Sequence, residues 1–182
     1  MNYSTFKFFF LVTFIVTIIG CSSNDDSSTE SDLSINEFVY DGETYELVTA
    51  FITDENTTTD EASDIGINIF NVTNSQTNGT VDNVTRVFFD VEDITLQETT
   101  YNEIADYEVA INGSFNAGDY SEGTLLLSDN DPQSTVFASS TTVSIHNITE
   151  TTIDLSFTFM RNDGKIISGK YNGDLINLNV ED

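Results

Sequence analysis

The chain has 182 residues, enough for one domain of ordinary size, and it carries 31 acidic residues against five basic ones. A formal charge of −26 leaves no basic patch of the kind that binds nucleic acid or anionic lipid, so the composition argues against both classes of partner. A single cysteine excludes a disulfide within the chain, and a single histidine excludes a histidine metal cluster.

Residues 1–20 have the organisation of a signal peptide. Lys7 is followed by an apolar run from Phe8 to Ile19, which is shorter than the roughly 20 residues that a membrane-spanning helix needs. Gly20, a small residue, then precedes Cys21, the only cysteine. No folded segment is predicted to follow Cys21 closely enough to bury its thiol.

This arrangement resembles the lipobox of bacterial lipoproteins. The resemblance implies cleavage between Gly20 and Cys21, a diacylglyceryl thioether on the Cys21 sulfur and acylation of the new amino terminus. Loss of Lys7 with the signal peptide leaves four basic and 31 acidic residues, a formal charge of −27. We therefore expect a mature protein that a lipid anchors in the outer membrane.

Residues 21–32 are predicted to form a flexible tether, because the segment that follows Cys21 contains no basic residue and is too polar to bury. The tether begins with Ser22, Ser23, Asn24, Asp25 and Asp26. This run resembles the export signal of surface lipoproteins in the Bacteroidota, in which acidic residues direct display on the outer face. A linker that is acidic without being a signal is the alternative, and we favour display on the outer surface.

Residues 33–182 are predicted to form one β domain. Beta-branched and aromatic residues dominate the periodic stretches, and proline occurs once. In chain order we expect strands over residues 37–40, 44–53, 65–72, 86–91, 107–111, 124–127, 141–148, 153–159 and 165–178, with hairpin turns at Asp41-Gly42 and Asn162-Asp163-Gly164. Residues 94–107 come nearest to a helical pattern and are expected to form a short helix or a turn.

The strand over residues 153–159 favours one of two all-β architectures. Apolar and polar residues alternate along it, so large side chains share one face: Ile153, Leu155, Phe157 and Phe159. A filled core of this kind favours an antiparallel β-sandwich of about eight or nine strands. A closed β-barrel is the alternative, and it holds a ligand only where interior residues are small.

Two segments of this domain have a further pattern. Residues 38–47 read FVYDGETYEL, and residues 156–175 read SFTFMRNDGKIISGKYNGDL. The D-G and D-G-K turns between short strands, with the closing G-x-Y-x-G, resemble small surface lipoproteins of the Bacteroidota. The matches and the lipobox cover about a third of the chain. The resemblance implies no particular activity and no catalytic residues.

No motif in the chain indicates a reaction. The G-x-S-x-G, P-loop and G-x-G-x-x-G patterns are absent. A Ser-His-Asp triad would have to use His146, whose place on the polar side of a predicted strand indicates a solvent-facing residue.

The acidic loops raise the hypothesis of a calcium site, because hard cations bind clusters of carboxylate oxygens. Asp54, Asp60 and Asp64 crowd the loop after the second predicted strand, and Asp129 and Asp131 flank Asn130 in a later loop. Neither group follows the EF-hand pattern. Solvated acidic loops are therefore the preferred interpretation, and no cofactor is predicted.

Two classes of function remain. The first is a non-catalytic surface module that binds a glycan, an ion or another envelope protein, or that is structural. Tyr101, Tyr107 and Tyr120 are its candidates for an aromatic platform that binds glycans. The second is a hydrolase that uses two carboxylates about 5–9 Å apart. The absence of catalytic motifs favours the first class.

Overall fold

The computed structural model describes residues 35–102, 104, 106–129 and 135–179, which all belong to one compact unit, Ser31–Asp182. The predicted signal peptide, the predicted lipidation site Cys21 and the predicted export segment 22–26 lie outside the described residues, and so does Asp131. No helix in the described part of the chain has the length and apolarity that crossing a membrane requires.

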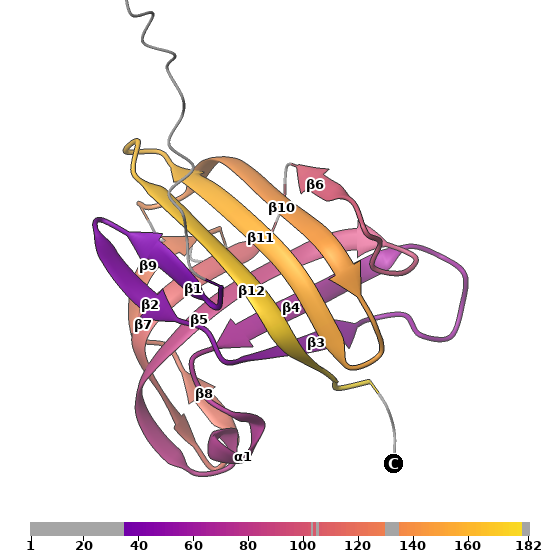
Figure 1. Ribbon diagram of the computed structural model, residues 1–182, viewed down its shortest axis with the longest axis horizontal. Coiled ribbons are helices and arrows are strands. Elements are labelled where there is room, and N and C mark those ends of the chain that lie inside the picture. Colours follow the sequence, from indigo (N-terminus) through magenta and orange to yellow (C-terminus); the bar gives the residue numbers. More distant parts are fainter. Residues whose placement is uncertain (1–34, 103, 105, 130–134, 180–182) are drawn as a thin grey trace, which may run out of the picture. The chain divides into compact units, whose positions relative to one another are not determined.

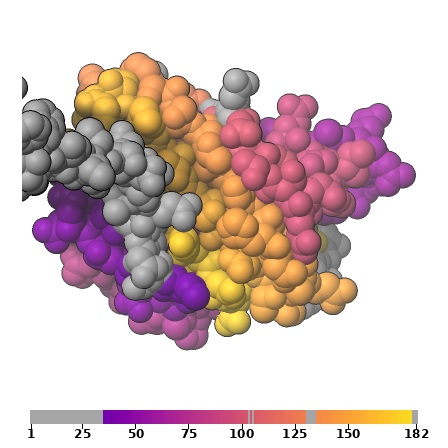
Figure 2. Space-filling view, turned by 45° about the horizontal axis from the view of Figure 1, so that its top comes forward, coloured from indigo at the N-terminus to yellow at the C-terminus, as the bar shows by residue number. Residues whose placement is uncertain are grey.

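Six strands form the first of two layers (Figure 1). They are β1 (Glu37–Tyr40), β2 (Glu43–Glu46), β6 (Thr100–Asn102), β10 (Ala138–Ile148), β11 (Thr152–Arg161) and β12 (Ile166–Asn177). Their order is β6-β10-β11-β12-β1-β2, and all neighbours within this layer are antiparallel. Figure 2 shows the outside of this layer, where the orange atoms of β10 and β11 lie beside the pink atoms of the segment that contains β6.

The second layer contains the other six strands. They are β3 (Thr49–Asp54), β4 (Ser63–Phe70), β5 (Thr80–Asp93), β7 (Tyr107–Asn116), β8 (Asp119–Ser121) and β9 (Thr124–Ser128). Strands β3, β4, β5 and β7 are successive antiparallel neighbours, and β8 and β9 pair with different parts of β7. The helix α1 (Asn74–Thr77) connects β4 to β5.

Strand β12 joins the two layers. Most of it pairs with β11, and its last part, Leu175–Asn177, pairs in parallel with Ala50–Ile52 of β3. The sheet is therefore continuous through β12, folds over itself and is not closed into a barrel. The predicted all-β, sandwich-like fold is confirmed, with twelve strands in place of eight or nine and with one parallel pairing.

The predicted strand over residues 44–53 is two strands in different layers. The chain crosses between the layers at Leu47 and Val48, where the Leu47 N–H donates to the Asn36 carbonyl at 2.9 Å and the Val48 N–H donates to the Phe70 carbonyl at 2.7 Å. Because apolar residues continue through the crossing, periodicity alone did not reveal it. Residues 94–107, predicted as a helix or a turn, contain bends and the short strand β6 in their described part.

The core lies between the layers, and the predicted apolar face of β11 is confirmed. Its four residues are at most 2% exposed: Ile153, Leu155, Phe157 and Phe159. The Phe159 ring stacks on Tyr107 of the opposite layer with ring centroids 5.9 Å apart. The predicted turn after β11 is also present, and Gly164 adopts a φ of 82° that favours glycine.

Candidate ligand-binding site

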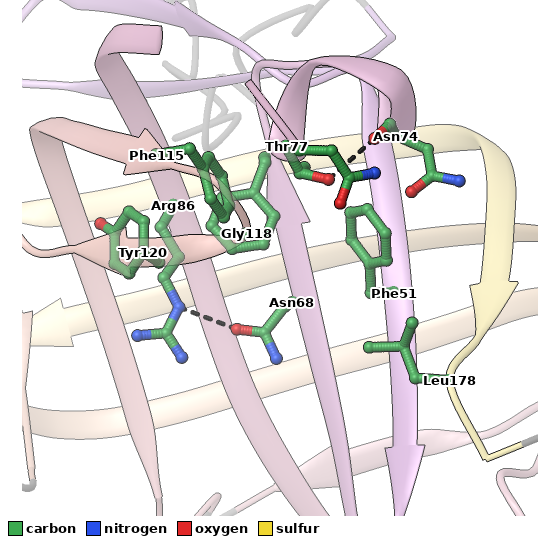
Figure 3. A pocket seen from close by; sticks show the side chains of 11 residues that line it. Phe51, Asn68, Asn74, Thr77, Arg86, Phe115, Gly118, Tyr120 and Leu178 are labelled. Atoms are coloured by element: carbon green, nitrogen blue, oxygen red, sulfur yellow. Dashed lines mark hydrogen bonds between the residues drawn. The ribbon is translucent and has the colours of Figure 1, made fainter. Parts of the chain in front are cut away.

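A cavity of about 430 Å³ opens on the face of the second layer that points away from the core (Figure 3). Its size lies within the range of roughly 300–1,000 Å³ that is typical of ligand sites. Figure 3 shows Arg86 and Tyr120 on one side, Phe51 and Leu178 on the other, and Asn68 between them. Residues of α1 complete the lining. We call this cavity the Arg86 pocket.

Two β-bulges shape the pocket. Asn83 on β5 and Asn112 on β7 are each an extra residue in the pairing of these strands, and both adopt a left-handed φ, of 59° and 58°. Asparagine is one of the residues that tolerate this conformation. An extra residue turns the side chains that follow it to the opposite face of the sheet. Beyond Asn112, Phe115 therefore packs with Phe51 and Phe70 in a second apolar cluster and not in the main core.

Aromatic rings supply the apolar wall, with Phe70 at the centre of the group. Its ring centroid lies 5.9 Å from Phe51, 5.1 Å from Phe115 and 5.5 Å from Tyr120, all in edge-to-face geometry. Gly113 makes room for Tyr120, because a Cβ at this position would lie 2.9 Å from the Tyr120 hydroxyl. Burial raises the pKa of Tyr120 to about 12, so its hydroxyl stays protonated at physiological pH.

Arg86 is the one charged residue in the described lining of the pocket. Its Nε donates to Asn68 Oδ1 at 2.8 Å, and its Nη1 donates to Glu108 Oε1 at 2.7 Å. The guanidinium carbon lies 4.7 Å from the ring centroid of Phe88 and 5.3 Å from that of Tyr120. Arg86 Nη2 and Asn68 Nδ2 have no hydrogen-bond partner within the described residues. Two donors are therefore held in fixed positions with hydrogen bonds still to make.

Two carboxyl groups lie behind Arg86. The Glu108 side chain contacts the guanidinium directly and is hydrogen-bonded to Glu122. Burial raises the pKa of Glu108 to about 7, Glu122 adds to the rise, and Arg86 opposes it. Near neutral pH Glu108 is therefore protonated for part of the time.

A second, acidic hollow of about 310 Å³ has Asp64, Asp90, Asp106 and Tyr101 among its lining residues. Burial raises the pKa of Asp90 to about 6, and the charges of Asp106 and Asp64 and a hydrogen bond from protonated Asp90 to Asp106 add to the rise. The Tyr101 hydroxyl donates to Asp93 Oδ2 at 3.1 Å. Burial and, after it, like-charge crowding therefore decide the electrostatics of this hollow.

The residues proposed for calcium do not assemble into a site in the described part of the chain. Asp54 accepts hydrogen bonds from the Asn56 N–H and from the Ser63 hydroxyl at the start of β4. Asp60 is exposed in the intervening loop, and Asp64 lines the acidic hollow. Asp129 follows β9, and Asp131 lies outside the described residues. No group of three or more His, Cys, Asp or Glu side chains is placed to hold a metal ion among the residues that the structure describes.

The three tyrosines proposed for an aromatic platform lie in different places. Tyr120 lines the Arg86 pocket, Tyr101 lines the acidic hollow, and Tyr107 is buried in the core. His146 is exposed, as its place in the predicted strand indicated, and its Nε2 lies 2.9 Å from Ser156 Oγ. No described carboxylate hydrogen-bonds to the His146 ring, so this pair lacks the third member of a triad.

Three residues of this site were not predicted from the sequence: Arg86, Asn68 and Glu108. One signal was available, because Arg86 is the only base between Lys7 and Arg161 in a strongly acidic chain. Its partners could not be read from alternation, since Asn68 and Glu108 are 18 and 22 residues away on neighbouring strands.

Comparison of the chain with models of known protein families, with curated proteins and with solved structures finds no match.

Proposed function

We propose that the mature chain is a lipid-anchored, surface-exposed protein of the outer membrane that binds a glycan in the Arg86 pocket and catalyses no reaction. The observation that carries the proposal is the fixed pair of unused donors, Arg86 Nη2 and Asn68 Nδ2, beside an aromatic wall. A ligand that displaces water from these donors has to replace the lost hydrogen bonds with acceptors of its own.

A sugar ring has the matching chemistry. It presents an apolar C–H face, which complements aromatic side chains, and a rim of hydroxyl oxygens, which accept hydrogen bonds. Asn74 and Asn78 add further amide groups to the described lining. Apolar walls that carry a few placed polar groups are the usual composition of a small-molecule site.

Binding is favoured over the alternative, a hydrolase that uses carboxylates. The described lining of the Arg86 pocket contains no aspartate or glutamate. The described carboxyl groups with a raised pKa, Glu108 and Asp90, are each in hydrogen-bond contact with a second carboxyl group, which is Glu122 for the first and Asp106 for the second. Glycoside hydrolysis needs a separation of about 5–9 Å, which leaves room for a nucleophile or a water.

A glycan array probed with the mature lipoprotein in detergent micelles tests binding at the pocket. We expect Asn68→Ala to lower the affinity for the glycan that the parent protein retains by roughly tenfold, because the variant loses one hydrogen-bond donor and no longer holds the Arg86 side chain in place. Asn172→Ala, which changes an exposed asparagine of β12 in the first layer, is the matched control and should bind like the parent protein. Equal losses in both variants, or no retained glycan, would count against the pocket.

The lipid anchor is tested at Cys21. The proposal rests here on the apolar segment and on the small residue that precedes the only thiol. Cys21→Ser should abolish palmitate labelling and release the protein from the membrane fraction, because a serine hydroxyl does not form the thioether. A variant that still labels and still sediments with membranes would refute the anchor and leave the pocket proposal intact.

A further inference from the structure

We infer that the Arg86 pocket selects uncharged sugars and excludes acidic ones, an inference that rests on the proposed glycan binding at this site. The residues that decide it are Arg86 and the two carboxyl groups behind it, Glu108 and Glu122. The unused N–H groups of Arg86 and Asn68 can donate to any oxygen, so hydrogen bonding alone does not distinguish a hydroxyl from a carboxylate.

The combined charge of Arg86, Glu108 and Glu122 distinguishes a hydroxyl from a carboxylate. One guanidinium is paired with Glu108, which contacts Glu122, so these three side chains are together neutral when Glu108 is protonated and Glu122 is ionised, and they carry one negative charge when both carboxyl groups are ionised. Together they are therefore not positive while at least one carboxyl is ionised. The surrounding mature chain, with a formal charge of −27, adds negative potential.

A ligand carboxylate would meet two opposing effects. It would gain a charge-assisted bond to Arg86, but Glu108 already lies 2.7 Å from the same guanidinium and compensates its charge. A further carboxylate would also have to approach Glu108 and Glu122. A sugar hydroxyl takes up the same donors without this repulsion, so the charge group favours the uncharged ligand.

The preference should depend on pH. The titratable and charged groups that face Glu108 are Arg86 on β5, Tyr120 on β8 and Glu122 in the loop that follows β8. Burial raises the pKa of Tyr120 to about 12, so this group stays neutral across the physiological range, and Glu108 is the group whose raised pKa lies there. As the pH rises through about 7, Glu108 loses its proton and the exclusion of acidic sugars should become stronger.

Matched sugars test the inference directly. The mature lipoprotein in detergent micelles is titrated calorimetrically with the methyl glycosides of glucose, galactose and mannose, and with those of the corresponding uronic acids, at about pH 5.5 and about pH 8. Members of a pair differ only at C6, which is a hydroxymethyl group or a carboxylate. For the pair that binds best, we expect the uronate to bind about tenfold more weakly than the hexoside at the higher pH, and less than that at the lower pH.

Glu108→Gln supplies the variant arm. Glutamine keeps an acceptor for Arg86 but cannot ionise, so the ratio of hexoside to uronate affinity should fall and should stop changing between the two pH values. Glu150→Gln removes one negative charge from an exposed loop residue and should leave the ratio as in the parent protein. Thermal melts of both variants establish that they are folded.

The outcomes separate the two proposals. Uronate binding that equals or exceeds hexoside binding at the higher pH would overturn the inference while glycan binding stands. If the ratio of hexoside to uronate affinity changes equally in Glu108→Gln and Glu150→Gln, the inference is also overturned, because the discrimination would then come from the net charge of the protein. If none of the six sugars binds at millimolar concentrations, the proposal that this pocket binds pyranose sugars is overturned.

Discussion

Gly169 lies in β12 between two aromatic residues of the core, with Phe38 on one neighbouring strand and Phe157 on the other. A Cβ at this position would lie 2.7 Å from the Phe38 Cβ and would overlap the Phe157 ring. We therefore expect Gly169→Ala to lower the free energy of unfolding by about 1–3 kcal/mol through overpacking, as measured in urea melts. The loss should shrink in a Phe157→Leu background, which frees space at the same point.

Gly79→Ala is the control for this prediction. The nearest atom to a Cβ there is the Gln76 carbonyl oxygen at 3.4 Å, so the substitution meets only modest crowding. Gly79→Ala should therefore change the free energy of unfolding by close to zero. If both alanine variants lose the same stability, the close packing around Gly169 is not the cause of the loss.

Asp90 should make the stability of the fold depend on pH. Burial and the neighbouring carboxylates raise the pKa of Asp90 from 3.8 to about 6, so the folded state holds this proton more tightly than the unfolded state. The contribution of Asp90 is therefore complete below about pH 4 and is lost as the pH rises through about 6. Asp90→Asn should flatten the stability profile between these values and should be more stable than the parent protein near pH 8.

A matched variant separates this local effect from net charge. Glu46→Gln removes one negative charge from an exposed position on β2, in the first layer and outside the lining of the acidic hollow. It should keep the pH dependence of the parent protein in denaturant melts at a series of pH values. A flattened profile for Glu46→Gln would assign the dependence to the overall charge.

At the scale of the elements, β11 offers the sharpest contrast between two neighbouring side chains. Phe157 is 2% exposed and lies against Phe38 and Phe159, with ring centroids 6.5 and 5.5 Å away. Thr158 lies on the exposed face. Phe157→Ala should cost about 3–5 kcal/mol, a large part of a total stability of roughly 5–15 kcal/mol. Thr158→Ala should change stability by no more than about 0.5 kcal/mol.

Urea melts of the Ser31–Asp182 unit measure both variants. A register slip of one residue would turn the buried face of β11 toward solvent. The difference in stability between the two variants therefore measures how strongly the buried face fixes the pairing of β11 with β10 and β12. Comparable losses for Phe157→Ala and Thr158→Ala would be inconsistent with a strand that buries only one face.

Alternation predicted those strands that bury one face along their whole length, and it failed where the backbone departs from a regular strand. Strand β11 and its hairpin with β12 were predicted because apolar residues recur at every second position and a D-G turn follows. Phe115 shows the failure, since the extra residue Asn112 reverses the face that a strict period of two assigns to it. Bulges are local backbone features, and asparagine is too common in this chain for its positions to reveal them.

The whole molecule explains why the Arg86 pocket was not predicted. Its lining comes from several strands of the second layer, from α1 and from the C-terminal end. The pairing of β4, β5 and β7 brings Asn68, Arg86 and Glu108 together, and the hydrophobic pattern of each strand carries no information on which polar residues will be neighbours. Composition was informative in one respect: basic residues are scarce in this chain, and this scarcity makes Arg86 distinctive.

The last prediction concerns where the whole protein is displayed. Asp25 and Asp26 follow the predicted lipidation site within five residues, and both belong to a tether without a basic residue. If the export machinery reads acidic residues beside the lipid, Asp25→Ala with Asp26→Ala should leave palmitate labelling intact and should protect the protein from protease added to intact cells. Glu30→Ala with Asp32→Ala removes the same two charges farther along the tether, and this pair should remain as sensitive as the parent protein. Equal protection in both pairs would assign the effect to the charge of the tether, and unchanged sensitivity of the Asp25 and Asp26 pair would make these residues part of a simple linker.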